Sequence, residues 1–405
     1  MLVALDDTDG PDGGCTTHTA LELAHRMGWR LRGMPRLVRL NPNCPHRTRG
    51  NGAVVLDVGD GTGPRAQVGS WLERPLWAYP DSGEALLPFD RTWATLQEIA
   101  EPDADPGLVM GEPLPMMLYR QAVTTAVEPE DVHALLDASG AKWAGGRGVL
   151  GAAAAMAWPG PATSHELIAY RTPERRGTKR LVRPGPLRTT QTFHTFDGDD
   201  LACVPASPCP VLLGLRAVEP EPLVDAVAAV RQAADEPLDG WCVFTTNQAS
   251  GDHVLDAPGF VGPAWTTLRV RATVAKAPVI GRGGHASVLL EDDDGKRATA
   301  WAFEPTGDFR HAVMSLRVGD VVEATGAFDD GLNLESLRLL DAVPTRIAPV
   351  CCGKSMKSMG RTGGFRCAVC RTKANGTMEA RATGAWEVPV RARRHLHRPF
   401  DLSPR

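Results

Sequence analysis

The sequence has 405 residues, of which 43% are hydrophobic and 23% are charged, and its formal net charge is −4. This length and composition suit about two to four cored domains and exclude a globally disordered chain. The absence of any run of about 18 apolar residues excludes a transmembrane helix. The N-terminus lacks the basic segment of a signal peptide, so we expect a cytoplasmic protein.

The charge is unevenly distributed along the chain. Residues 343–405 carry 10 Arg and 3 Lys against 3 acidic residues, a net +10, whereas the preceding 342 residues carry 31 basic and 45 acidic residues, a net −14. A basic end on an acidic body indicates a nucleic-acid-binding region joined to a different function. A solvated tail is the alternative.

The first part of the chain alternates between strand and helix patterns. Apolar runs predict strands, and apolar residues at helical spacing predict helices, the first of them N-capped by Thr16 or Thr17. Residues 102–117 are rich in proline and acidic residues and read as a linker or long loop. The alternation predicts an α/β or α+β region over residues 1–260. The expected strands are 2–5, 36–40, 53–58, 165–170 and 211–215, and the expected helices are 16–27, 129–138 and 221–235.

The pattern changes near residue 262, where short β-rich runs begin. Five strands with one helix between the third and the fourth are typical of an OB-fold, with a plain small barrel or sandwich as the alternative. The runs are 268–275, 287–291, 297–303, 320–328 and 332–340, and the helix is 308–316.

Three carboxylates, Asp6, Asp7 and Asp9, follow the first predicted strand. Carboxylates this close repel one another unless a cation neutralises them, and Mg²⁺ prefers such oxygen ligands together with substrate phosphates. The next residues lead into a helix through two glycines, so backbone N–H groups and the helix N-terminus can hold phosphates. An Asp/Gly-rich turn capped by threonine is the alternative. This candidate cradle consists of Gly13, Gly14, Cys15, Thr16 and Thr17.

Two further segments carry polar or glycine-rich patterns. Arg47, Arg49 and Asn51 can contact phosphates or a base, although a surface loop would explain them equally well. Residues 146–151 match G-x-G-x-x-G, but the segment 129–138 before them is predicted to be helical. A dinucleotide site needs a preceding strand, so we expect close backbone packing here, or a turn that contacts nucleotide or RNA.

Four of the nine cysteines lie between residues 351 and 370. Cys367 and Cys370 form a CxxC knuckle typical of half a zinc ribbon. The other pair is adjacent, and adjacent cysteines are not expected to reach two good tetrahedral positions together without backbone strain. We therefore predict Cys352, Cys367 and Cys370 as zinc ligands, and the fourth ligand stays open between Cys351, a distant histidine and none.

In order and spacing, these segments resemble the archaeal isoleucine-tRNA 2-agmatinylcytidine synthetases over nearly the whole chain. The matching segments are DDTD (6–9), GGCTT (13–17), PRLVRLNPN and TRGNGAV (within 35–54), GGRGVLGA (145–152), HELIAYR (165–171), PCPVLLGLR (208–216), TNQ and DH (within 246–253), CGKSMKS and GFRCAVC (within 352–370) and ARRHL (392–396).

The resemblance implies a multidomain α+β protein with a kinase-like catalytic domain, a ferredoxin-like domain, an OB-fold and a C-terminal zinc ribbon. It implies that ATP activates the C2 oxygen of the wobble cytidine in the CAU anticodon of an isoleucine tRNA. Agmatine then replaces that oxygen, and the tRNA reads AUA. In this family the threonine after the motif cysteine is autophosphorylated, and here that residue is Thr16.

The residues therefore receive provisional roles. Asp7, Asp9 and Thr16 are expected to be catalytic, and Asp6, Gly13, Gly14, Cys15 and Thr17 to bind ATP. Asp6, Asp7 and Asp9 would also hold Mg²⁺, and Zn²⁺ would bind the ribbon. The expected RNA contacts are Arg47, Arg49, Asn51, Arg393 and Arg394.

We expect residues 1–115 to form the catalytic domain, with 205–260 as a candidate continuation. Residues 116–260 would form the ferredoxin-like domain, 262–343 the OB-fold, 344–380 the ribbon and 381–405 a basic tail. Two other functions remain open from the residues alone. One is a non-catalytic RNA-binding protein, and the other is a related ATP-dependent RNA-modifying enzyme that uses another amine.

Overall fold

A computed structural model of the chain describes residues 1–47, 50–59, 69–71, 74–75, 88–360 and 363–402. The chain divides into two compact units. The first unit comprises residues 1–255, 263–267 and 389–405, and the second unit comprises 256–262 and 268–388. Among the described residues, no helix is long and apolar enough to cross a membrane.

The first unit is built on a ten-stranded sheet in the order β11-β8-β12-β2-β3-β1-β6-β7, with β4 and β5 attached through β12. All neighbours run antiparallel except β12 and β2, which are parallel. The strands are β1 (Leu2–Asp6), β2 (Arg36–Arg39), β3 (Gly52–Asp57), β4 (Gly69–Trp71), β5 (Arg74–Pro75), β6 (Gly107–Gly111), β7 (Lys142–Gly145), β8 (Ser164–Arg171), β11 (Val211–Ala217) and β12 (Leu238–Thr246); β9 (Phe196–Asp197) and β10 (Asp200–Leu201) form a separate hairpin.

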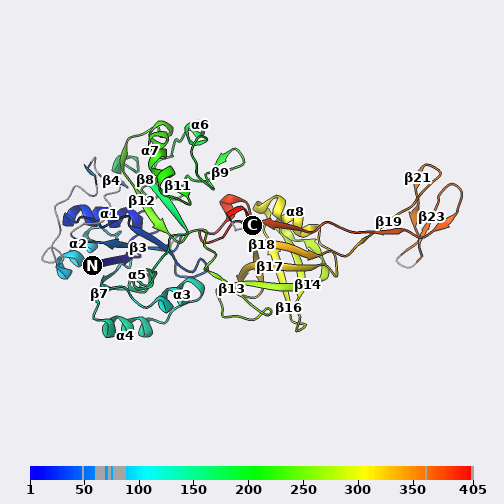
Figure 1. Ribbon diagram of the computed structural model, residues 1–405, viewed down its shortest axis with the longest axis horizontal. Helices are drawn as coiled ribbons and strands as arrows, with labels where there is room; N and C mark the ends of the chain where they lie inside the picture. The colour runs from blue at the N-terminus through cyan, green and yellow to red at the C-terminus, as the bar shows by residue number, and fades with distance from the viewer. Residues whose placement is uncertain (48–49, 60–68, 72–73, 76–87, 361–362, 403–405) are drawn as a thin grey trace. The chain divides into compact units, whose positions relative to one another are not determined.

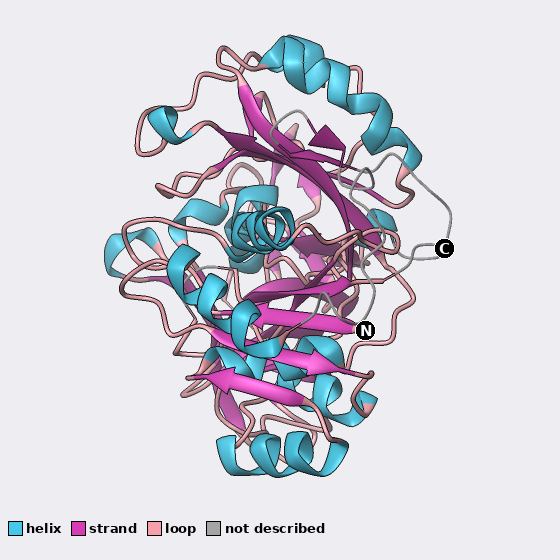
Figure 2. Cartoon of the chain, turned by 90° about the vertical axis from the view of Figure 1, so that its left-hand side faces the viewer, coloured by secondary structure: helices cyan, strands magenta, loops and turns pink. Residues whose placement is uncertain are grey.

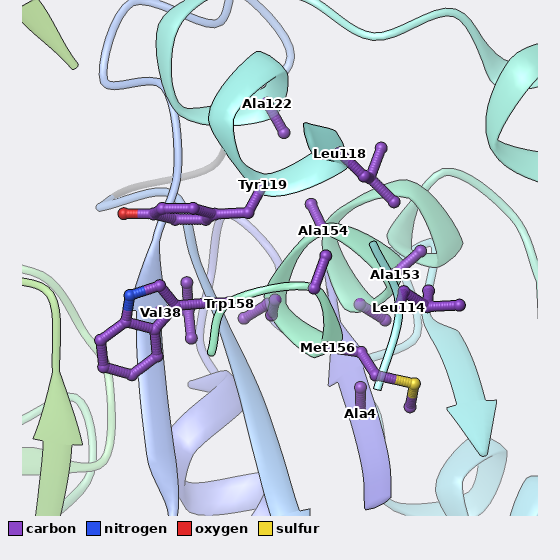
Figure 3. Packing of buried hydrophobic residues seen from close by; sticks show 14 of the residues in the cluster. Ala4, Val38, Leu114, Leu118, Tyr119, Ala122, Ala153, Ala154, Met156 and Trp158 are labelled. Carbon is purple, nitrogen blue, oxygen red and sulfur yellow. The ribbon is translucent and has the colours of Figure 1, made fainter. Parts of the chain in front are cut away.

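Helices cover both faces of this sheet (Figure 2). Successive strand residues point to opposite faces, so Ala4 packs on one side with α3, α4 and α5, and Val3 on the other with α1 and α2. Figure 3 shows α5 between Ala4 and Val38 of the strands and Leu118 of α3. The helices are α1 (Thr16–Met27), α2 (Phe89–Ile99), α3 (Met116–Thr124), α4 (Pro129–Ser139), α5 (Gly148–Met156), α6 (Pro184–Leu187) and α7 (Glu221–Ala233).

Two local predictions for the first unit are wrong. Residues 102–117 are not a linker, because β6 lies within them, pairs with both β1 and β7, and is buried. The prolines flank its apolar run instead of interrupting it, so the ladder hydrogen bonds survive. The N-cap of α1 is Cys15, with no side-chain capping bond, and not Thr16 or Thr17.

The second unit contains the predicted five-stranded barrel. Its strands lie in the order β14-β15-β16-β18-β17, and β17 pairs back with β14, which closes the barrel. The expected helix is present as α8 (Asp308–Met314), between β16 and β17 (Figure 1). The barrel strands are β14 (Thr266–Ile280), β15 (Ala286–Glu291), β16 (Arg297–Ala302), β17 (Val321–Phe328) and β18 (Leu332–Asp341); β13 (Val254–Asp256) pairs with β14, and β26 (Gly384–Glu387) pairs with β18.

Short hairpins follow the barrel in the sequence. Met356, Phe365 and Cys367 form the small core of this segment. Its strands are β19 (Thr345–Ile347), β20 (Val350–Cys351), β21 (Lys354–Ser355), β22 (Lys357–Ser358), β23 (Phe365–Arg366), β24 (Lys373–Ala374) and β25 (Thr377–Glu379), paired as β19–β25, β20–β21 and β22–β23–β24.

Candidate active site

A cavity of about 490 Å³ opens in the first unit, and segments far apart in the sequence meet around it. Gly13 and Gly14 do not line it, nor do Arg393 and Arg394, and Arg49 lies outside the described residues. The predicted residues that line the cavity are Asp6, Asp7, Asp9, Cys15, Thr16, Thr17, Arg47 and Asn51.

Asp6 ends β1 at the cavity wall. Burial, together with the charges of Asp7 and Asp9, raises the pKa of its carboxyl to about 7, against a backbone hydrogen bond and the charge of Arg147 that lower it. Gly151 on α5 lies against this carboxylate, and a Cβ at that position would overlap an Asp6 oxygen. The carboxylate therefore occupies space that only glycine leaves open.

Asp7 pairs with Arg147, a residue that the sequence motifs did not single out. The Nε and Nη2 atoms of Arg147 donate to one Asp7 oxygen at 3.2 and 3.1 Å. The Arg147 backbone N–H donates to Asp105 at 2.8 Å, which fixes the loop that carries it. Burial raises the pKa of the Asp7 carboxyl and the arginine opposes that shift. A cation of the protein thus neutralises part of the acidic cluster.

The acidic cluster suits a cation that also binds a substrate. Among the described residues, the only group of three or more acidic, cysteine or histidine side chains close enough to share one metal ion is a set of four cysteines. Asp6, Asp7 and Asp9 therefore line one wall without converging on a single point. Mg²⁺ usually takes one or two protein carboxylates and completes its shell with phosphates and water, so this donor set fits a nucleotide-bound ion.

The start of α1 forms the adjoining wall of the cavity. Thr8 Oγ1 donates to Thr16 Oγ1 at 3.4 Å, and the Cys15 sulfur lies 3.1 Å from Thr17 Oγ1. No side chain caps the first turn, so backbone N–H groups at this helix N-terminus are suited to an anion. Gly14 has φ +73, and a Cβ there would meet the side chain of Glu101.

A second charged cluster lines the cavity. Glu166 accepts from Arg39 Nη2 at 3.4 Å and from Arg216 Nε at 3.1 Å. Gln248 donates to the same carboxylate, and Arg216 Nη2 donates to His395 Nδ1 at 2.9 Å. Arginine charges outweigh burial and lower the pKa of Glu166. The sequence analysis assigned no role to this cluster, although all five residues lie in segments that carry the family resemblance.

The four predicted RNA-contact residues that the structure describes are tied into the first unit. Arg47 donates to the Pro42 carbonyl at 2.6 Å, and Asn51 Nδ2 donates to the Asn41 carbonyl at 2.7 Å. Arg394 also donates to the Pro42 carbonyl, at 3.3 Å, and Arg393 donates to His194. Contacts with RNA stay predictions for all of them.

The G-x-G-x-x-G segment serves backbone packing. Residues 129–138 are helical as predicted, within α4, and the strand β7 that follows them pairs antiparallel with β6. That pairing is unlike the parallel unit of a dinucleotide site. A Cβ on Gly148 would meet the Gly107 nitrogen and the Asp6 carbonyl, so glycine lets α5 approach β1 and β6 closely.

In the second unit, four cysteine sulfurs lie within 4.8 Å of one another, those of Cys351, Cys352, Cys367 and Cys370. Both adjacent cysteines belong to this group, including Cys351, which the sequence left open as the fourth ligand. Cys352 adopts φ +49, and its sulfur lies 3.9 Å from that of Cys351. The sulfur of Cys351 lies 3.4 Å from that of Cys370. Four thiols at such spacings fit a tetrahedral zinc ion with bonds of about 2.3 Å.

The comparisons with known proteins agree along the chain. Family models match residues 2–146 as the TiaS TCKD domain, residues 146–253 as the TiaS FLD domain and residues 348–383 as the TiaS C-terminal zinc ribbon domain.

Proteins named as TiaS, the 2-agmatinylcytidine synthetase of the second isoleucine tRNA, are similar over full length. That of Archaeoglobus fulgidus is 33% identical, covering 99% of this chain and 97% of its own. That of Methanopyrus kandleri is 34% identical, covering 99% and 96%.

Solved structures agree as well. The complex of TiaS with this isoleucine tRNA and ATP has a TM-score of 0.79 at 33% identity. The complex of TiaS with the same tRNA, AMPCPP and agmatine has a TM-score of 0.78 at 28% identity. Each similarity covers 99% of this chain and 96% of the other. On this full-length similarity, the chain belongs to the TiaS family.

Proposed function

We propose that this protein is an ATP-dependent ligase that joins agmatine to the wobble cytidine of the isoleucine tRNA with a CAU anticodon. Relatives of full-length similarity are named 2-agmatinylcytidine synthetases of an isoleucine tRNA, and a related structure holds that tRNA, an ATP analogue and agmatine together. One observation carries the proposal for this chain. The acidic end of β1 and the uncapped start of α1 meet in one cavity, which suits a metal-bound triphosphate.

We assign the nucleotide to this wall of the cavity. Asp6, Asp7 and Asp9 would hold Mg²⁺ on the triphosphate, and the loop from Gly13 to Thr17 would hold the phosphates through Cys15, Thr16 and Thr17, which line the cavity. Mg²⁺ would supply charge neutralisation on the phosphate oxygens. Thr16 would be the phosphoryl acceptor of autophosphorylation. Thr16 begins α1 and lines the cavity, and its hydroxyl accepts a hydrogen bond from Thr8. This position beside the proposed triphosphate supports the role.

The chemistry requires activation of a poor leaving group. The C2 oxygen of cytosine leaves readily once a phosphoryl group from ATP is bonded to it. The primary amine of agmatine, in its unprotonated form, then forms a bond to C2, the C2–O bond breaks and the oxygen departs with the phosphoryl group as phosphate, and the amine nitrogen releases a proton. The wobble base must leave its stack to reach the cavity, which costs less in a loop than in a duplex. The net negative charge of residues 1–342 also suits agmatine, a dication.

The finer domain assignments are proposals as well. In the barrel, the fifth strand, β18, lies between the third and the fourth, and the first strand, β14, pairs with the fourth, β17. This order supports an OB-fold at residues 262–343. The parallel pairing of β12 with β2 supports a kinase-like catalytic domain of residues 1–115 that residues 205–260 complete. Residues 116–260 would hold the ferredoxin-like domain, 344–380 the ribbon and 381–405 the basic tail.

We assign the four-cysteine cluster to one Zn²⁺, with Cys351 as the fourth ligand. The sulfur spacings and the partly buried position of the cluster support this assignment. A protein that retains tRNA modification with no zinc on elemental analysis would contradict it.

Labelled-agmatine incorporation tests the function. The assay contains the full-length protein, ATP, Mg²⁺ and a transcript with a CAU anticodon, beside a matched transcript with UAU. We expect incorporation only with ATP and only into the CAU transcript. ATP consumption without agmatine transfer would favour a related enzyme that uses another amine, and tRNA binding without ATP consumption would favour a non-catalytic RNA-binding protein.

Asp7→Asn separates chemistry from binding in the same assay. The variant loses one negative charge at the acidic wall, so we expect ATP turnover to fall by at least about 100-fold while tRNA binding stays within about twofold. Unchanged turnover would overturn the assignment of the acidic wall.

A further inference from the structure

The cluster of Arg39, Arg216 and Glu166 carries more positive than negative charge. Both arginines share one carboxylate, and Glu166 is only 5% exposed. The neighbouring ring of His395 adds no charge, because burial and three nearby arginines hold its pKa well below the usual range. A partly buried site with one surplus positive charge calls for an anionic partner.

One donor of this cluster lacks an acceptor. The Nε of Arg39 is buried and has no hydrogen-bond partner among the described residues, while the side chain of Arg39 lines the cavity. Buried N–H groups are nearly always satisfied in folded proteins. An anion, or a water that the anion holds, would satisfy this one.

The C-terminal segment positions the other arginine. His395 Nδ1 lies 2.9 Å from Arg216 Nη2 and 3.3 Å from Gln248 Oε1; because a guanidinium can only donate, we assign Nδ1 as the acceptor and the proton of the neutral ring to Nε2. The segment is fixed by backbone bonds, from Ala249 N–H to the His395 carbonyl at 2.9 Å and from Gly251 N–H to the Leu396 carbonyl at 2.8 Å. Glu166 and His395 together hold the Arg216 guanidinium by Nε and Nη2.

We infer that Arg39 and Arg216 form a phosphate-binding subsite in the cavity, and that His395 is a positioning residue that aligns Arg216 for it. The subsite rests on the proposed function for the source of its ligand, which is a phosphate of ATP or of the RNA backbone. Two arginines held by a carboxylate and a neutral imidazole present fixed N–H groups, the arrangement that planar recognition of phosphate oxygens requires.

Equilibrium binding of ATP without tRNA, and of tRNA without ATP, identifies the phosphate source. Arg216→Gln removes the charge and is expected to weaken one of the two ligands by about 10- to 100-fold, leaving the other within about twofold. His395→Ala should weaken the same ligand by about 3- to 10-fold. His395→Asn keeps an acceptor near the position of Nδ1 and should restore binding to within about threefold.

His165→Asn is the matched control. His165 is a buried histidine next to Glu166 that bonds to the Val218 carbonyl and does not line the cavity. His165→Asn should leave the affinities for ATP and for tRNA unchanged. Arg216→Lys keeps the charge and replaces Arg216→Gln if the latter fails to fold, with a smaller loss expected for the same ligand.

The subsite is overturned if Arg216→Gln, or Arg216→Lys in its place, and His395→Ala bind both ligands as the unsubstituted protein does. It is equally overturned if His395→Asn and His165→Asn lose affinity as His395→Ala does, because the effect is then structural. Agmatine incorporation by the unsubstituted protein is scored separately. If agmatine incorporation fails while the Arg216 and His395 variants still show these losses of affinity, the proposed function is rejected and the phosphate-binding subsite is retained.

Discussion

Arg147 occupies one side of Asp7 where a metal ion is proposed to bind. The Arg147 side chain is 46% exposed and the Asp7 side chain 13% exposed, so solvent weakens the pair and a divalent ion can compete with it. Arg147 would then be available to contact the phosphates that arrive with the ion.

Arg147→Ala therefore has opposite effects on two ligands. Without nucleotide, we expect Mn²⁺ to bind about 3- to 10-fold more tightly, because the competing cation is gone. ATP affinity should fall. Titration of free Mn²⁺ by electron paramagnetic resonance measures the first effect. Arg26→Ala, which removes an exposed arginine paired with Glu22 on α1, should leave Mn²⁺ affinity unchanged, and weaker Mn²⁺ binding by Arg147→Ala would refute the competition.

Asp6 makes the stability of the metal-free protein depend on pH. Its pKa is raised in the folded state to about 7 from 3.8, so the folded state binds the proton more tightly than the unfolded state. The contribution of the Asp6 carboxyl to the free energy of unfolding is therefore greatest below about pH 4, and it is lost as the pH rises to about 7. The shift corresponds to at most about 4 kcal/mol.

Asp6→Asn should remove that penalty. In chelator, urea unfolding of Asp6→Asn and the unsubstituted protein should give similar stabilities near pH 4, and the variant should be more stable near pH 8. Equal pH slopes for the two proteins would show that Asp6 is not responsible.

At the scale of elements, α5 owes its position to two glycines with different neighbours. Gly151 faces the Asp6 side chain, whereas Gly148 faces the backbone of Gly107 and Asp6. A side chain can change its rotamer at a small energetic cost, whereas moving a backbone strand disrupts its hydrogen bonds. Alanine at the two positions should thus have separate consequences.

Gly151→Ala should keep the fold, helped by about 1 kcal/mol of helix propensity, and lose ATP turnover because Asp6 is displaced. Gly148→Ala should lower the melting temperature by at least about 5 °C. Thermal melts and ATP turnover of both variants separate these effects, with Gly185→Ala as a control that has open space around it. Normal turnover by Gly151→Ala would show that the position of Asp6 tolerates displacement.

Among the described residues of the four-cysteine hairpins, the core consists of three buried side chains, those of Met356, Phe365 and Cys367. So small a core is expected to depend on its metal. Chelation should melt residues 348–383 and leave the barrel folded, as seen by hydrogen exchange. Cys351→Ser and Cys352→Ser should each reduce the zinc content below one ion per chain. If Cys351→Ser kept a full zinc ion, Cys351 would not be a ligand, and the zinc would be held by the other three cysteines.

Regular elements could be predicted where the local pattern and the tertiary packing agree. Helix α1 and the barrel strands follow their apolar periodicity, so the sequence predicts their existence and order. β6 was missed because its prolines stand at the flanks, and only its pairing with β1 and β7 shows the segment to be a strand.

The site could be predicted only in part for a similar reason. Asp6, Asp7, Asp9 and the residues of α1 are neighbours in sequence, so a motif shows them. Arg147 reaches Asp7 across 140 positions and His395 reaches Arg216 across 179. Pairings at such separations depend on how the sheet is assembled, and one sequence contains no signal for them.

At the scale of the whole molecule, the chain leaves the first unit and later returns to it. The barrel and the four-cysteine hairpins lie between residues 255 and 389 of the sequence, and residues from Pro389 onward belong again to the first unit. Arg391 bonds to Asp197 at 2.7 Å and to Asp200 at 2.9 Å, and Leu396 is buried in the core beside α5. The returning segment is therefore part of the first unit's structure.

A chain that ends after Val388 should lose stability in the first unit alone. We expect its melting transition to fall by several degrees, since a buried leucine contributes about 1.5–3 kcal/mol and two backbone bonds are lost with it. The barrel transition should not move. A chain that ends after Leu402 is the control, and an unchanged first transition in the shorter chain would show that the segment contributes nothing.

Because the chain returns to the first unit after the barrel, the ribosome synthesises the barrel before the last segment of the first unit. A ribosome that adds about 5–20 residues per second needs several seconds to pass from Leu255 to His395, and during that time the barrel can fold while Arg216 lacks its imidazole partner. A nascent chain therefore has a finished barrel before it has a finished cavity. Interrupted translation would leave products that cannot align Arg216, so the first unit is completed last although most of its residues are made first.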